Sequence, residues 1–288
     1  MKKTLIALAA VAVTGVASAQ MTVYGVLDSG ITQTNGTTTF TSGVNGTPRL
    51  GFKGSEDLGG GLKAAFVIET GFNMGAETAT SIGDRGARLA VTGSFGTVEI
   101  GSSILSASFF TKAAFDVTGT NNYSIGSYGG ATRNDKSINY TNSFGPVTAR
   151  ASFTLNDDNA GAGATDIGLV YVAGPLAVGY SNSSATGKTS GTMIGASYNL
   201  GVAKVAASQV ESLVATSAAQ ETTTAFEVSV PVGSASVQFQ SSKAKNTAVK
   251  TNMLAVEYPL SKATKLTAYT RKATSADGVT GFGIRHNF

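Results

Sequence analysis

Apolar and polar residues alternate with a period of two over most of the chain. Between residues 48 and 54, Leu50 and Phe52 share one face, and Arg49 and Lys53 share the other. This spacing predicts β-strands with one apolar and one polar face. The same alternation recurs in five further segments: 62–72, 147–153, 226–230, 236–240 and 253–258.

Turn signals divide the chain after residue 20 into about sixteen such segments. We expect strands over residues 22–33, 47–56, 62–73, 84–94, 96–104, 133–143, 146–155, 165–173, 175–183, 192–200, 202–211, 222–230, 233–242, 250–259, 262–272 and 279–288. Tight turns such as Phe144-Gly145-Pro146 follow the even-numbered segments, and longer polar stretches such as 34–46 follow the odd-numbered ones. Strands of about ten residues, even in number, with short turns at one end only, are typical of outer-membrane barrels. The sequence therefore predicts an all-β fold, a transmembrane antiparallel β-barrel.

The last segment keeps the alternation up to its final residue. Phe288 falls on the same face as Phe282 and Ile284. A strand here can pair with residues 22–33, which would close the barrel and leave no free edge. A frayed C-terminal tail is the alternative, but such tails are seldom regular amphipathic strands.

The first nineteen residues have the pattern of a secretory signal peptide. Lys2 and Lys3 precede an apolar stretch over 5–13, and Ala17-Ser18-Ala19 has the small residues of a cleavage site. An N-terminal anchor helix is the alternative, but the apolar stretch is shorter than the roughly 20 residues that a span needs. We therefore expect a signal peptide over 1–19 and one barrel domain over 20–288.

The composition excludes several kinds of site. The sequence has no Cys and one His, and only 13% of its residues are charged. Disulfides, thiolate zinc sites and Cys nucleophiles are therefore excluded. The single His286 lies two residues from the C-terminus, where no catalytic constellation can be assembled around it. We expect no enzyme activity, no cofactor and no metal site, and the absence of a basic stripe with interleaved aromatics argues against nucleic acid.

The longest connection, residues 105–132, is rich in aromatic residues. It contains Phe109, Phe110, Phe115 and the acidic Asp116. Loops of this length are uncommon in compact structures unless they are functional. The aromatic residues favour a loop that packs against another part of the protein. A disordered surface loop is the alternative, because the second half is rich in Gly, Ser and Asn.

Four stretches resemble the general porins of the Gram-negative outer membrane, of the beta-proteobacterial type. They are residues 23–28, 49–64, 93–98 and 283–288, and the resemblance extends over essentially the whole mature chain. The second stretch is specific because it combines a strand, an acidic glycine-rich turn and the next strand. The resemblance implies a trimeric barrel of sixteen strands, with the loop over 105–132 folded into the lumen as a constriction.

The resemblance also implies a function and a set of partners. Such a protein lies in the outer membrane among lipid and lipopolysaccharide, and forms a water-filled channel for passive diffusion of small hydrophilic solutes and inorganic anions. The barrel-assembly machinery would recognise the C-terminal strand that ends at Phe288. A substrate-specific outer-membrane channel is the alternative within transport, and a surface β-rich adhesin is a more distant one.

Strand alternation puts most charged side chains on the lumen face. A Lys or Arg that faces lipid at mid-membrane costs about 2–4 kcal/mol, so this placement is expected even without a role in transport. The pore-lining candidates selected by alternation are Arg49, Lys53, Glu69, Arg88, Arg133 and Arg150. Other lumen positions are Asp28, Glu99, Asp135, Glu227, Glu257, Lys265, Arg271 and Arg285.

The resemblance places pore arginines at Arg49, Arg85 and Arg133, facing an acidic group of the third loop, for which Asp116 is the candidate. Strict alternation conflicts with this at Arg85, which it points outward, whereas it points Arg88 inward. A β-bulge would reconcile the two, and both residues stay candidates. The sequence departs from the family at 101–103 and at Asn139, where arginines are common, so we expect only a mild anion preference.

Overall fold

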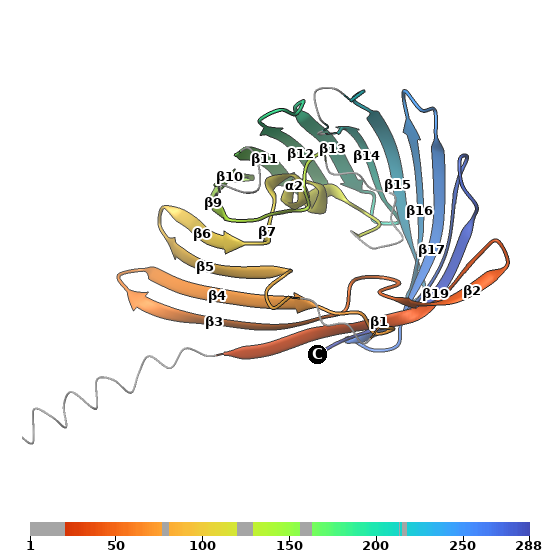
Figure 1. Ribbon diagram of the computed structural model, residues 1–288, viewed down its shortest axis with the longest axis horizontal. Coiled ribbons are helices and arrows are strands. Elements are labelled where there is room, and N and C mark those ends of the chain that lie inside the picture. The colour runs from red at the N-terminus through yellow and green to blue at the C-terminus, as the bar shows by residue number, and fades with distance from the viewer. Residues whose placement is uncertain (1–20, 77–80, 120–128, 156–162, 213, 215–217) are drawn as a thin grey trace, which may run out of the picture.

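The chain folds into one closed antiparallel β-barrel (Figure 1). The structure is a computed structural model that describes residues 21–76, 81–119, 129–155, 163–212, 214 and 218–288. The expected signal peptide over 1–19 lies outside these residues. Sixteen strands form the barrel wall: β1 (Thr22–Thr34), β3 (Arg49–Gly59), β4 (Leu62–Gly71), β5 (Gly86–Gly93), β6 (Gly96–Ser102), β9 (Ser137–Phe144), β10 (Val147–Thr154), β11 (Ala164–Ala173), β12 (Leu176–Ala185), β13 (Gly191–Asn199), β14 (Lys204–Glu211), β15 (Thr222–Val232), β16 (Ala235–Ala244), β17 (Lys250–Pro259), β18 (Thr264–Ala273) and β19 (Val279–Asn287).

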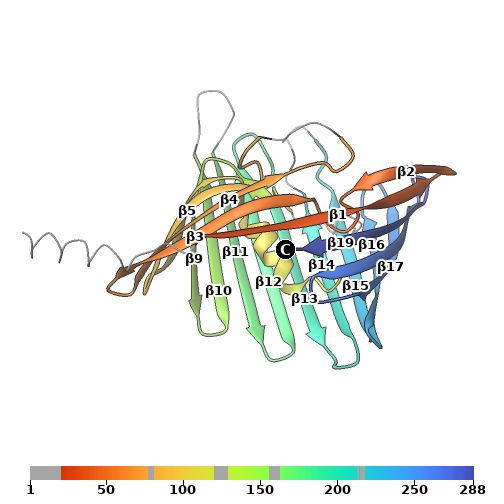
Figure 2. The same cartoon turned by 90° about the horizontal axis from the view of Figure 1, so that it is seen from below.

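The barrel is closed by the pairing of its first and last strands. β1 pairs antiparallel with β19, with Leu27 opposite His286 and Ile31 opposite Phe282. Beyond the last ladder residue, the backbones of Gly25 and Phe288 exchange two hydrogen bonds of 3.0 and 3.1 Å. Closure removes both sheet edges, so the prediction of a sixteen-stranded antiparallel barrel is confirmed. Tight turns such as those from β9 to β10 and from β11 to β12 lie at the same end (Figure 2).

The two faces of the wall differ as the alternation predicts. Leu89, Ile194 and Phe226 are between 47% and 64% exposed on the outside, whereas Glu227 and Gln240 are at most 1% exposed on the inside. An outer face so rich in exposed apolar side chains suits a lipid environment. Among the described residues, no helix combines the length and apolarity needed to cross a membrane.

One hairpin lies where we expected a loop. The strand β2 (Thr37–Ser42) folds back on the end of β1, within the expected loop over 34–46. The turn between them is Asn35-Gly36, and both residues have positive φ, 48° and 79°. Asn-Gly with two positive φ angles is the favoured two-residue hairpin turn. The sequence signal was therefore present, but it was outweighed by the polar composition of the stretch.

A short helix, α2 (Ala107–Phe115), lies on the concave side of the barrel wall and packs against β11 and β12 (Figure 1). Ser106 caps its start, because the Ser106 Oγ accepts a 3.0 Å hydrogen bond from the Phe109 N–H. Ahead of the helix, β7 (Ile104–Leu105) pairs with β8 (Arg133–Asn134), which returns the chain to the wall. Residues 120–128 lie outside the described part of the chain, so the course of the whole loop stays a prediction.

Three glycines of the wall make room for α2. A Cβ atom at Gly195 would lie 2.3 Å from the Phe115 ring, and one at Gly168 would lie 2.4 Å from the Thr111 hydroxyl. A Cβ at Gly179, which is the direct cross-strand partner of Gly195, would lie 2.7 Å from the Thr111 methyl group. The helix therefore approaches the sheet at a place where any larger residue would hold it away.

Candidate pore site

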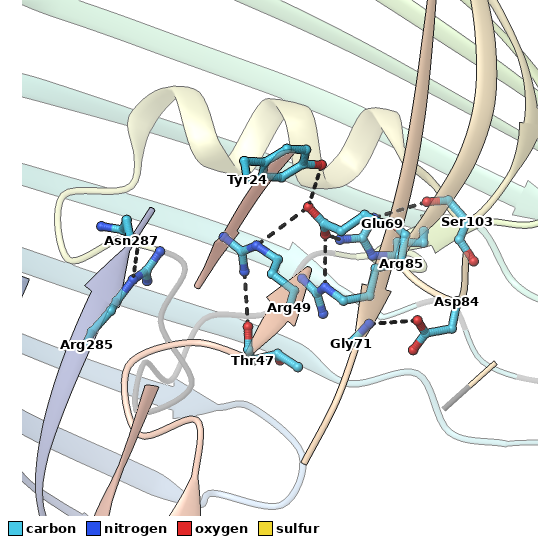
Figure 3. Close-up of polar contacts among 11 residues, drawn as sticks. Tyr24, Thr47, Arg49, Glu69, Gly71, Asp84, Arg85, Ser103, Arg285 and Asn287 are labelled. Carbon is cyan, nitrogen blue, oxygen red and sulfur yellow. Dashed lines mark hydrogen bonds and ion pairs between the residues drawn. The ribbon is translucent and has the colours of Figure 1, made fainter. Parts of the chain in front are cut away.

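Three arginines converge on one glutamate at the loop end of the first strands (Figure 3). The Glu69 carboxylate lies 3.0 Å from Arg85 Nε, 3.6 Å from Arg49 Nε and 3.8 Å from an Arg133 guanidinium nitrogen. The Tyr24 hydroxyl donates a further 3.0 Å hydrogen bond to Glu69. One negative charge therefore holds three positive charges together, and these come from β3, from the residue before β5 and from β8.

A second cluster, in which two arginines share one glutamate, lies further along the barrel wall. Glu99 lies 3.1 Å from Arg88 Nε and 2.9 Å from an Arg150 guanidinium nitrogen. Arg150 also donates to the Leu105 carbonyl at 2.9 Å and lies over the Phe110 ring, with 5.9 Å from Cζ to the ring centre. This arginine therefore ties the wall to the start of the long loop.

The two clusters carry a net positive charge. Together they contain five arginines and two glutamates, which leaves three uncompensated positive charges. The arginines are partly exposed, with 11–24% of each side chain accessible. Burial, followed by repulsion from Arg85, lowers the pKa of Arg133 to about 10, which still leaves its guanidinium charged at neutral pH. A concentration of partly hydrated guanidinium groups attracts anions.

Arg85 and Arg88 both reach the inner side, through different routes. Arg88 lies within β5 and follows its alternation, whereas Arg85 precedes the first residue of that strand, Gly86. The Arg85 N–H donates to the Glu69 carbonyl at 3.1 Å, which continues the hydrogen bonding with β4 beyond the ladder. The ladder of β4 with β5 has no register shift from Lys63–Thr92 to Glu69–Gly86, and Arg85 lies immediately before its end. The alternation of side chains in β5 does not apply to Arg85, because β5 begins one residue after it.

The remaining two candidates lie elsewhere. Lys53 is exposed on β3, with its Nζ atom 5.2 Å from the centre of the Tyr24 ring. Asp116 follows α2 and differs from our expectation, because it does not face the arginines across water. Its side chain is only 2% exposed, and its carboxylate lies 3.1 Å from Lys112 Nζ. Its charge is therefore offset by Lys112 within the contact between α2 and the wall.

Lys112 anchors α2 to β15, further along the same wall. Its Nζ atom lies 2.8 Å from Glu227 Oε1 on β15, and the Val117 N–H donates to the other oxygen of Glu227 at 3.1 Å. Gln240 donates to the same carboxylate at 2.8 Å. Burial opposes the positive charge of Lys112, but the attraction of Asp116 and then of Glu227 outweighs it and raises the pKa of Lys112. The anchor therefore stays charged throughout the neutral range.

Another segment on the inner face was missed by sequence reasoning. Val44 is 2% exposed and packs with Met253, Ala255 and Tyr269 of β17 and β18. The neighbouring Asn45 is buried against the same wall. Its side chain donates to the Thr267 hydroxyl at 3.0 Å and to Glu257, and accepts from Arg285 at 3.0 Å. A signal for this inward fold was the apolar Val44 in a stretch that is mostly polar.

Neither cluster offers catalytic chemistry. Each carboxylate is held by guanidinium groups rather than placed beside a nucleophile, and no group of metal ligands occurs among the described residues. Partly hydrated charges on the inside of a barrel suit the passage of ions and polar solutes.

The comparisons with known proteins agree with this geometry. The family model described as Gram-negative porin matches residues 4–277. The chain is a Gram-negative porin. It is 30% identical over 249 residues to outer membrane porin protein 32 of Delftia acidovorans, which covers 71% of this chain and 68% of that protein. It is also 37% identical to the major outer membrane protein P.IB of Neisseria gonorrhoeae, over 35% of this chain and 32% of that one.

Solved porin structures share the fold. The porin superimposes on the anion-selective porin from Comamonas acidovorans with a TM-score of 0.75 and 23% identity, over 94% of this chain and all of that one. The Rhodopseudomonas blastica porin, as a triple mutant, gives a TM-score of 0.75 at 14% identity, over 93% of this chain and all of that one. These relatives are channels of the outer membrane, and this porin is likewise an outer-membrane barrel that forms a channel.

Proposed function

We propose that this porin is a passive diffusion channel with a mild preference for anions, set by the arginines around Glu69 and Glu99. The observation that carries the proposal is the charge excess of the two clusters, five arginines against two glutamates on one side of the barrel. Anions that pass this wall meet partly hydrated guanidinium groups, whose attraction is screened by salt.

The preference is mild for two physical reasons. Glu69 and Glu99 each lie within 4 Å of their arginines and cancel part of the positive potential. The wall also carries the neutral Ser102 and Asn139 next to the second cluster, where the family resemblance places arginines. The C. acidovorans porin is anion-selective, which supports the direction of the preference.

The loop over 105–132 supplies the constriction in this proposal. Its helix α2 lies on the concave face, and Phe115 packs with Ala177, Met193 and Val210 of the wall. Arg150 links the loop start to the second arginine cluster through the Leu105 carbonyl. In this proposal the narrowest part of the channel lies between α2 and the arginines around Glu69.

The assembled form in this proposal is a homotrimer. Its support is an apolar hollow on the outer face of β4 to β6, which is lined by Phe66, Ile68, Ala87, Leu89, Ile100 and other residues of these strands. A hollow of this kind accepts apolar side chains of another copy. Unheated gel mobility and analytical ultracentrifugation in detergent distinguish a trimer from a monomer.

The decisive experiment is the reversal potential of the purified porin in a planar bilayer across a potassium chloride gradient. We expect the sign of the reversal potential to show that chloride passes faster than potassium. The potential should be larger at low salt than at high salt. A cation-selective or non-conducting protein would contradict the proposal.

A further inference from the structure

The sheet beside β1 is interrupted at mid-height by residues that leave the wall. β2 pairs with β1 as far as Ser42, which is opposite Ser29, and β3 resumes the pairing at Arg49, which is opposite Val26. Residues 43–48 lie between these two ladders, whereas only two residues of β1 lie between the same two points. Six residues against two is a much larger insertion than the single extra residue of a β-bulge. This stretch, which we call the inner segment, therefore leaves the plane of the sheet.

The inner segment turns toward the lumen and lies on the inner faces of the last three strands. Val44 packs with Met253 of β17 and with Tyr269 of β18. Asn45 reaches Glu257 on β17, which is three strands away from β1 around the barrel. With about 4.8 Å between neighbouring strands, the inner segment and its side chains extend along roughly 14 Å of the wall. Figure 1 shows this orange link between β2 and β3 on the concave side of the wall.

Hydrogen bonds at both ends hold the inner segment in this position. The Asp28 carboxylate accepts the Asn45 N–H at 3.1 and 3.2 Å and the Gly46 N–H at 2.9 Å. The Asn45 side chain uses its amide nitrogen and its oxygen in bonds to the wall, as described above. At the far end, the Phe72 N–H donates to the Pro48 carbonyl at 3.1 Å. The segment is therefore a fixed part of the barrel interior.

The tip of the inner segment borders the water of the channel. Leu27, at the same height on β1, is 40% exposed on the lipid face, so the segment lies at membrane depth. Irregular backbone at this depth occurs only where it is buried in protein or borders water. Gly46 and Thr47 are partly exposed. An Arg49 guanidinium nitrogen donates to the Thr47 carbonyl at 3.3 Å, which places the tip next to the arginines around Glu69 (Figure 3).

The inner segment occupies space in the lumen without adding charge. None of residues 43–48 is acidic or basic. The wall charges around it occur as opposite pairs, because Lys265 Nζ lies 2.7 Å from Glu257, and Arg285 is directly opposite Asp28 on the neighbouring strand. Its effect on transport should therefore be one of size, which separates it from the effect of the arginine clusters.

We propose that the inner segment forms a further side of the constriction and determines the largest neutral solute that passes. α2 narrows the lumen along β11, β12 and β15, and the arginines border it along β3 to β6. The inner segment narrows it along β17, β18 and β19, which neither of these covers. This inference rests on the proposed diffusion channel, but it concerns the size limit for solutes and is independent of the ion preference.

The test compares the entry of neutral sugars of increasing size into liposomes that contain the porin. Arabinose, glucose, sucrose and raffinose are the probes, and the swelling rate is the readout. In the first variant, threonine followed by valine replaces residues 43–48. The two residues restore an uninterrupted strand opposite β1, with threonine toward the lumen and valine toward lipid. We expect the size limit to shift toward the larger sugars.

A second variant should shift the size limit in the opposite direction. Gly46 does not adopt the left-handed region, and the nearest atom to an added Cβ is a terminal nitrogen of the flexible Arg285 side chain, at 3.0 Å. G46L therefore adds bulk at the tip of the inner segment, and sucrose and raffinose should enter more slowly relative to arabinose. G278L is the matched control, because it adds the same bulk to the exposed loop between β18 and β19. It should leave the size limit unchanged.

A third variant keeps the test decisive where the replacement of residues 43–48 does not fold. N45A removes the side chain that fixes the inner segment to the wall, and it should also admit larger sugars. Its control is N246A, which changes the same residue type in the exposed loop between β16 and β17. Heat-modifiable migration in gels identifies folded protein in every case.

The outcomes separate this inference from the proposed function. Opposite shifts of the size limit in the replacement variant and in G46L, with an unchanged reversal potential, would support it. An unchanged size limit in folded variants would overturn it, and so would a shift in the same direction in both. A reversal potential that moves toward zero while the size limit stays constant would mean that the segment acts on charge, which also overturns it. Failure of the proposed ion preference would instead be seen in the unmodified porin.

Discussion

Lys112 and Glu227 are 115 positions apart in the sequence, yet the Lys112 ammonium lies 2.8 Å from the Glu227 carboxylate. Both side chains are almost fully buried, and Asp116 completes the cluster at 3.1 Å from the same ammonium. One cation is thus shared by two carboxylates at the contact between α2 and β15. This relationship fixes the position of the helix inside the barrel.

Replacement of Lys112 should destabilise the fold much more than replacement of Glu227. K112M leaves two buried carboxylates without a counter-charge, and loss of one partner of a buried pair costs about 3–5 kcal/mol of folding free energy. E227Q leaves Lys112 paired with Asp116, so its cost should be smaller. Thermal unfolding in detergent and the open-channel noise of single channels measure both variants. Equal effects of K112M and E227Q would contradict this account of the cluster.

The raised pKa of Lys112 determines the pH above which its ion pairs stop stabilising the protein. A raised folded-state pKa stabilises the protein fully below the unfolded value of 10.5, and this contribution is lost as the pH rises through the folded value. We expect the stability difference between the unmodified porin and K112M to shrink as the pH rises above about 10. Denaturation followed by fluorescence or circular dichroism at several pH values measures that difference. A difference that falls already between pH 7 and 9 would be inconsistent with the paired geometry.

The glycines under α2 can be tested by adding one methyl group. A Cβ at Gly195 would lie 2.3 Å from the Phe115 ring, so G195A should push the helix from the wall and cost about 1–3 kcal/mol. We expect an altered single-channel conductance, because the proposed constriction includes the helix. The double variant G195A/F115L should recover part of the change. G278A is the matched control, since the nearest atom to its new Cβ lies at 3.8 Å.

Removal of positive charge and removal of negative charge at the Glu69 cluster should change the anion preference in opposite directions. R49S/R133S removes two positive charges, so the reversal potential should move toward zero. E69Q leaves Arg49, Arg85 and Arg133 without their shared carboxylate, and the anion preference should increase, most clearly at low salt. K262S, in the turn between β17 and β18, serves as the control and should leave the potential unchanged. A shift of the same sign in R49S/R133S and E69Q would mean that these residues do not set the preference.

Closure of the barrel should depend on the last residue. The Phe288 ring lies over Gly25, where a Cβ would be 2.3 Å from the ring, and the two backbones exchange hydrogen bonds. F288A removes this contact, so we expect a lower yield of heat-modifiable folded barrel. F282A changes the same residue type on the same outer face of β19, where Phe282 is 51% exposed, and should be milder. If both variants fold with equal yield, the closing contact is not what makes the C-terminal Phe important.

The strands and the two faces of the wall could be predicted from the sequence, because alternation with period two is a local property. Leu50 and Phe52 must face lipid if Arg49 does not, whatever the rest of the chain does. The inward placement of Arg49, Glu69, Arg88 and Glu99 followed from the same parity. The Asn35-Gly36 hairpin was equally local, and was missed only because the stretch around it is polar.

Contacts across the lumen could not be predicted in this way. Parity placed Glu227 on the inner face, but only the packing of α2 on that face makes Glu227 the partner of Lys112. The same holds for Asp116, whose acidic character suggested a pore-lining role, while its distance to Lys112 makes it part of a buried anchor. Asn45 joins Glu257, Thr267 and Arg285 only because closure brings the last strands next to the first. The sequence by itself thus determined which side of each strand faces lipid, since that depends on a spacing of two residues. The tertiary structure decided which charges meet, because the curvature of the wall brings together residues that no local pattern connects.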